Sequence, residues 1–91
     1  MSDGAAPEPD GVARVFIVEI SSAPDALVRV LSVCATRQID LSSVAFEAAR
    51  AGGAVRIEAA GLGEHDAQRL AARLQAEPVV VGVTVGWRVQ A

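Results

Sequence analysis

The feature that most constrains the fold is the order in which two kinds of apolar periodicity alternate along the chain. Four segments carry apolar side chains at or near every second position, which is typical of β-strands. Two segments repeat apolar side chains every three or four positions, which is typical of amphipathic helices. The strand-like segments are residues 13–20, 39–50, 54–60 and 79–89, and the helical segments are residues 22–38 and 61–78.

The resulting order is strand, helix, strand, strand, helix, strand. It predicts an α+β fold of the ferredoxin-like βαββαβ type, a sandwich in which a four-stranded antiparallel sheet carries both helices on one face. Right-handed crossovers leave few other topologies. The first strand presents Phe16 and Val18 on one face and Val15 and Ile17 on the other. Because no helix remains for the second face, we expect a second copy of the chain to cover it.

The same periodicities predict which side chains are buried. Ser22 is a candidate N-cap, and Asp25 three residues later would complete a capping box. Side chains that point away from the core are expected at Arg56 and Glu58, between the inward Val55, Ile57 and Ala59. The predicted buried faces are Leu27, Val30, Leu31 and Cys34 in the first helix and Ala67, Leu70, Ala71 and Leu74 in the second. In the last strand, one face carries Val79, Val81, Val83, Val85 and Trp87.

The composition of the chain argues against several classes of protein. Residues 1–11 are rich in Pro, Asp, Glu and Gly, so we expect a disordered N-terminal tail followed by a single domain over residues 12–91. The net charge is −3 and the eight basic residues, all Arg, are scattered, which argues against a nucleic-acid partner. No apolar run is long enough to span a membrane and no signal peptide is visible. With the single Cys34, these features favour a cytoplasmic protein.

Several chemistries common on this fold lack their residues. An RNA-binding sheet needs stacking aromatics on its central strands, where only Phe16 is found, and a metal carrier needs a CxxC motif. The chain contains no Asn, which an acylphosphatase-like site would require. We interpret His65 as a solvated surface residue and Cys34 as a small core residue. Trp87 fits a core position or a subunit interface equally well.

Residues 21–44 carry a resemblance. Ser22, Ala23, Pro24 and Asp25 stand where ACT domains usually read Asn-x-Pro-Gly, and the Val- and Leu-rich helix "ALVRVLSVCATR" follows. The segment "RQIDLSSV" then stands in place of Arg-Gly-aromatic-Asn-Ile-Glu-Ser-Leu. The chain therefore resembles an ACT domain, the amino-acid-sensing module of regulated metabolic enzymes. It is most similar to the short, single-domain type of acetolactate synthase small regulatory subunit.

The resemblance implies a regulatory subunit rather than an enzyme. It implies a homodimer with sheets side by side that associates with and activates a catalytic large subunit in branched-chain amino-acid biosynthesis. That large subunit would hold thiamine diphosphate, Mg²⁺ and flavin, and this chain would hold no cofactor and no metal. A branched-chain amino acid would bind at the seam between the two sheets. The candidate ligand-binding residues are Ser22, Ala23, Pro24, Asp25, Ala26, Asp40 and Leu41.

Two departures from the ACT pattern bear on that ligand. Asp25 replaces a Gly that lets a ligand approach the backbone, and Asp40 replaces an Asn that contacts the ligand. Both carboxylates repel the carboxylate of an amino acid, so we expect weak or absent valine feedback. Two alternatives stay open: a free-standing ACT amino-acid sensor that controls another enzyme or regulator, and a small enzyme that uses the open sheet face.

Overall fold

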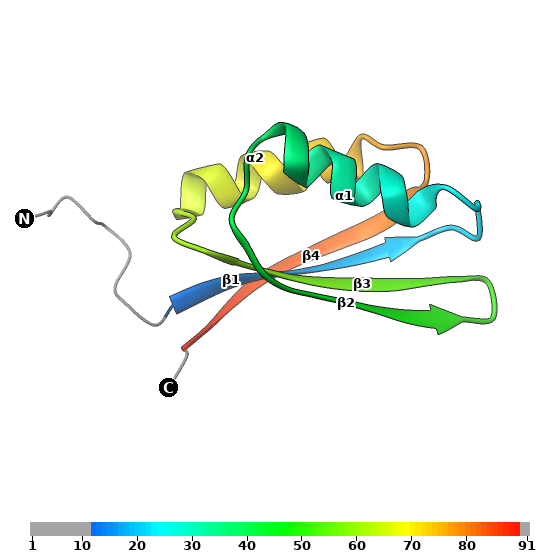
Figure 1. Cartoon of the computed structure of the whole chain (residues 1–91), viewed down its shortest axis with the longest axis horizontal. Helices are drawn as coiled ribbons and strands as arrows, with labels where there is room; N and C mark the ends of the chain where they lie inside the picture. Colours follow the sequence, from blue (N-terminus) through cyan, green and yellow to red (C-terminus); the bar gives the residue numbers. More distant parts are fainter. Residues whose placement is uncertain (1–11, 90–91) are drawn as a thin grey trace, which may run out of the picture.

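The computed structural model describes residues 12–89, which form the expected α+β sandwich (Figure 1). The sheet order is β2-β3-β1-β4 with antiparallel pairing throughout, and both helices lie on the same side of it. The predicted ferredoxin-like fold class is confirmed. The tail expected over residues 1–11 lies outside the described residues. The elements are β1 (Val12–Ile20), α1 (Ala26–Thr36), β2 (Leu41–Ala49), β3 (Gly52–Ala60), α2 (Glu64–Gln75) and β4 (Val80–Val89).

The core lies between the two inner strands and the helices. Phe16 of β1 pairs with Ile57 of β3, and Val18 pairs with Val55; all four side chains are fully buried. Burial of side chains of this size stabilises the fold by about 1.5–3 kcal/mol each. The predicted helix faces are confirmed in outline, although Leu27, Leu31 and Ala71 are only half-buried. The helices bury Ala26, Val30 and Cys34 from α1 and Ala67, Leu70 and Leu74 from α2.

The start of α1 differs from the prediction. Asp25, not Ser22, is the N-cap residue, and no side chain caps the helix. The reason is a turn ahead of the helix, in which the Ala26 amide donates to the Ala23 carbonyl at 3.1 Å. The first helical bond then runs from the Arg29 amide to the Asp25 carbonyl at 3.0 Å. The capping box predicted for Ser22 and Asp25 is therefore wrong, because the helix begins three residues later than Ser22 allows.

The β2 strand is an edge strand that the helices leave uncovered. Val44 pairs with Ile57 and Phe46 with Val55, so both lie on the helix side of the sheet. They are nevertheless 42% and 46% exposed. Both faces of this strand therefore stay accessible, unlike those of β1 and β3.

The other edge strand, β4, contains an irregularity. Glu19 pairs with Gly82 but Ile20 pairs with Val80, so Val81 has no partner in the register. Val81 is 66% exposed. The regular alternation predicted through Val79, Val81 and Val83 is wrong at this point, because the extra residue of a β-bulge buries Val80 and leaves Val81 exposed.

The sheet face opposite the helices, which the sequence left without a covering helix, is partly buried within the single chain. Ile17 is half-buried, while Val15 is buried. Arg56 and Glu58 point to this face, away from the core, as predicted. Glu58 is only 5% exposed, however, and its Oε2 accepts a hydrogen bond from the Arg56 Nε at 3.2 Å. A buried carboxylate of this kind requires such a partner.

The end of α1 is closed by a residue in the left-handed region. Gln38 has a φ of 57°, and the Ile39 amide donates to the Cys34 carbonyl at 3.1 Å. This is the helix-ending geometry that usually selects Gly, because a Cβ is disfavoured at positive φ.

Gln38→Gly is therefore expected to raise the free energy of unfolding by about 1 kcal/mol, measured by urea denaturation. As a control, Gln68→Gly at an exposed interior position of α2 should lower it by about 1 kcal/mol. Equal destabilisation by both substitutions would contradict the argument.

Candidate functional site

The loop between β1 and α1, which carries most of the predicted ligand contacts, is held by a backbone–backbone hydrogen bond and a backbone–side-chain hydrogen bond. The Ser21 amide donates to the Val79 carbonyl at 2.8 Å, and the Ala23 amide to the Ser21 Oγ at 3.4 Å. Ser22, Pro24 and Asp25 are exposed, Ala23 is half-buried, and Ala26 is buried in the core. The loop is thus anchored at both ends and presents its middle to solvent.

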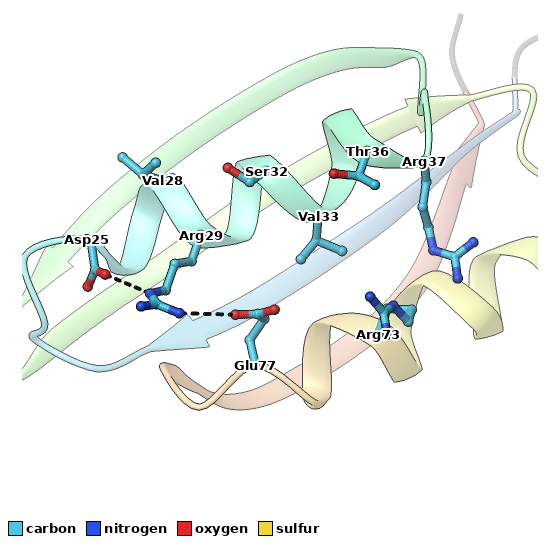
Figure 2. Close-up of a pocket in the computed structure, with 9 residues that line it drawn as sticks. All are labelled: Asp25, Val28, Arg29, Ser32, Val33, Thr36, Arg37, Arg73 and Glu77. Carbon is cyan, nitrogen blue, oxygen red and sulfur yellow. Dashed lines mark hydrogen bonds and ion pairs between the residues drawn. The ribbon is translucent and has the colours of Figure 1, made fainter.

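The carboxylate of Asp25 is engaged within the chain. Its Oδ2 accepts a hydrogen bond from the Arg29 Nε at 2.7 Å, one turn further along α1. This bond lowers the pKa of Asp25 and raises the pKa of Arg29. Arg29 also lies 3.9 Å from a Glu77 carboxylate oxygen (Figure 2). The charge of Asp25 is therefore partly offset, which weakens the repulsion expected at the loop.

The remaining predicted site residues lie elsewhere. Asp40 is exposed and Leu41 is half-buried at the start of β2, beyond the far end of α1. The 11 residues of α1 separate them from the loop by about 16 Å of helix. Asp25 and Asp40 accordingly line different pockets. One chain alone does not bring the two halves of the predicted ligand site together.

The residues singled out for reactivity lie in ordinary surroundings. His65 is exposed on α2 and Cys34 is fully buried, where burial raises the pKa of its thiol. Within residues 12–89 no three His, Cys, Asp or Glu side chains gather closely enough to hold a metal ion. No helix in the same range is long and apolar enough to cross a membrane.

Sequence reasoning missed two exposed apolar surfaces at opposite edges of the sheet. The first, the β2 edge patch, consists of Val44 and Phe46. The second, the β4 edge patch, consists of Val85 and Trp87, which are 39% and 61% exposed and lie beside α2. All four lie on the helix side of the sheet, and only the position of the helices leaves them uncovered.

A groove of about 670 Å³ runs between α1 and α2 (Figure 2). At one end lie the Asp25, Arg29 and Glu77 side chains described above. At the other end Arg37 and Arg73 reach toward one another from the two helices. No local pattern in the sequence joins Arg73 to Arg37, because the two line the same groove only through the packing of the helices.

No protein-family model and no curated protein matches this chain. Among solved structures, it is similar to the solution structure of the C-terminal domain of the MgtC protein from Mycobacterium tuberculosis. The TM-score is 0.62 at 19% sequence identity, and the match covers 90% of this chain and 92% of that chain. At this identity the likeness shows a shared fold and nothing about activity.

Proposed function

We propose that this chain is a regulatory, non-catalytic ACT subunit of the cytoplasm. In this proposal it pairs with a second copy of itself and activates a catalytic acetolactate synthase large subunit in branched-chain amino-acid biosynthesis. The resemblance over residues 21–44 supports the family. The observation that carries the proposal is the presence of two separate apolar patches at opposite edges of one sheet. Such surfaces suit a subunit that must contact two partners at once.

The β2 edge patch suits a second copy. An uncovered edge strand offers backbone donors and acceptors that another strand can pair with. Val44 and Phe46 lie on the helix side of that edge, where a neighbouring sheet would continue the apolar layer. Val28 of α1 is also exposed, at 64%, and points away from α2 (Figure 2). Pairing of two β2 edges would join the sheets side by side.

A two-fold pairing of β2 edges would also assemble the ligand site. The loop after β1 lies near Gly52, at the Ala49 end of β2, because Ser21 backbone lies against Gly52. Asp40 lies at the opposite end, next to Leu41. Antiparallel pairing sets the Leu41 end of one copy beside the Ala49 end of the other. Asp40 and Leu41 of one copy would then face residues 22–26 of its partner.

The β4 edge patch is the surface we assign to the catalytic subunit. Trp87 and Val85 lie beside Glu64 and Gln68 of α2, so an apolar centre is bordered by polar side chains. Exposed Trp surrounded by a polar rim is typical of the residues that dominate binding energy at interfaces. With the β2 edges joined, this patch would remain free on the outer edge of each copy.

The pairing predicts a dimer that depends on the β2 edge. The double substitution Val44→Lys and Phe46→Lys should weaken dimerisation at least about tenfold, because charged side chains at an edge oppose strand pairing. Analytical ultracentrifugation of the full chain would measure this. Val81→Lys, at an exposed position on the other edge, is the matched control and should leave the dimer intact. A wild-type monomer at tens of micromolar would refute the pairing.

The assignment of the partner is tested by co-expression with a thiamine-dependent acetolactate synthase catalytic subunit. The two chains should co-purify, and the turnover of the catalytic subunit should rise. Trp87→Ala should weaken this association by about thirtyfold, as loss of a central aromatic at an interface does, without dissolving the dimer. Val81→Ala serves as the control. If the chains neither associate nor alter turnover, the free-standing sensor becomes the better reading.

The two carboxylates predict weak amino-acid binding. Valine, leucine or isoleucine at low millimolar concentration should give no shift in the melting temperature of the wild-type chain. The double variant Asp25→Gly and Asp40→Asn restores the usual ACT residues and should gain a shift. A ligand at about a hundred times its Kd adds roughly 2.7 kcal/mol, which is easily measured. A clear shift in the wild type would overturn the roles given to Asp25 and Asp40.

A further inference from the structure

The two ends of the groove between the helices differ in charge: acidic side chains balance an arginine at one end, and two arginines lie at the other. At the end near the start of α1, Arg29 is held between two carboxylates, with 2.7 Å to Asp25 and 3.9 Å to Glu77. At the other end, Arg37 follows α1 and Arg73 projects from α2, and the two side chains point toward one another (Figure 2). Within residues 12–89 neither of these two guanidinium groups forms an ion pair or a hydrogen bond to a side chain.

The convergence of two like charges needs an explanation. Glu77 is the carboxylate one turn beyond Arg73 in the chain, but it turns to Arg29 instead. Asp40 and Asp66 line the adjoining pocket of about 340 Å³, which Arg37 also borders, and they do not line the groove between Arg37 and Arg73. Two guanidinium groups that face the same space repel one another, and an anion between them would reverse the sign of that interaction.

The chemistry of the two side chains defines the anion. Each guanidinium donates parallel hydrogen bonds in a planar fork that matches the oxygens of a phosphate group. The hydroxyl-bearing side chains of Ser32 and Thr36 also line the groove. Its volume of about 670 Å³ falls within the range of small-molecule sites. The protein as a whole carries a net charge of −3, so this positive end is a local feature rather than part of a basic surface.

We propose that the Arg37 and Arg73 end of the interhelical groove binds a phosphate group, either free or carried by a small phosphorylated metabolite. The site lies in the helix layer, away from the β2 and β4 edge patches. Both arginines belong to one chain, so the proposal requires neither the dimer nor the catalytic partner, although Arg37 also borders the pocket that contains Asp40.

The test is a titration of the full-length ¹⁵N-labelled chain with orthophosphate, pyrophosphate and glycerol 3-phosphate, at constant ionic strength set with sodium chloride. Saturable shifts are expected in the Nε–H signals of Arg37 and Arg73 and in the backbone amides around both residues. Pyrophosphate should bind more tightly than orthophosphate, because its two phosphate groups can accept hydrogen bonds from both guanidinium groups at once. Binding of glycerol 3-phosphate as well as orthophosphate assigns the site to phosphate esters, and its exclusion assigns the site to the free anion.

The matched variants separate a site from a general charge effect. Arg37→Gln and Arg73→Gln should each weaken binding at least about tenfold, as the loss of charge-assisted hydrogen bonds does. Arg50→Gln removes the same charge from the exposed turn between β2 and β3 and should leave binding unchanged. All three positions are exposed, and unchanged amide spectra elsewhere would report an intact fold. Shifts that fail to saturate, or an equal loss in Arg50→Gln, would overturn the proposal.

Discussion

The packing of both helices against the two inner strands is the interaction on which the rest of the structure depends. Phe16 and Val18 of β1 and Val55 and Ile57 of β3 form the floor of the core, and Val30, Leu70 and Leu74 are among the side chains that close it from above. With so few aromatics, the core depends on aliphatic side chains that fit closely. The helices sit over the centre of the sheet, and apolar side chains at its two edges stay exposed.

The exposed edges connect the fold to its proposed role. The core covers the two inner strands but not the edge strands β2 and β4. Both edges of the sheet therefore expose apolar side chains. Such surfaces are costly for an isolated chain, because they invite unspecific association. In a regulatory subunit of the proposed kind, these exposed edges would be the surfaces that bind partner proteins. The separation of the loop residues 22–26 from Asp40 and Leu41 fits the same scheme, since two chains are needed to bring them together.

The sequence predicted the fold well and the candidate site only in part. Apolar alternation identified Phe16, Val18, Val55 and Ile57 as inward-facing, and the same pairs fill the core. Alternation failed where the chain departs from regular geometry. Val81 lies in a bulge, so Val80 is buried in its place, while Val83 and Val85 keep the face that the alternation gave them. The capping box at Ser22 failed because a turn delays the start of the helix, and a turn of that kind leaves little trace in side-chain type.

The sequence by itself determined the order and type of the elements, because local periodicity records which side of each element must leave water. It also places carboxylates at positions 25 and 40. Only the tertiary structure decided that Glu58 is buried and that Arg37 and Arg73 line the same groove. The burial of Glu58 and the shared groove of Arg37 and Arg73 depend on distances between residues remote in the chain, whereas Asp25 and Arg29 are four residues apart at the start of one helix. Such distances are fixed by packing, which no local pattern encodes.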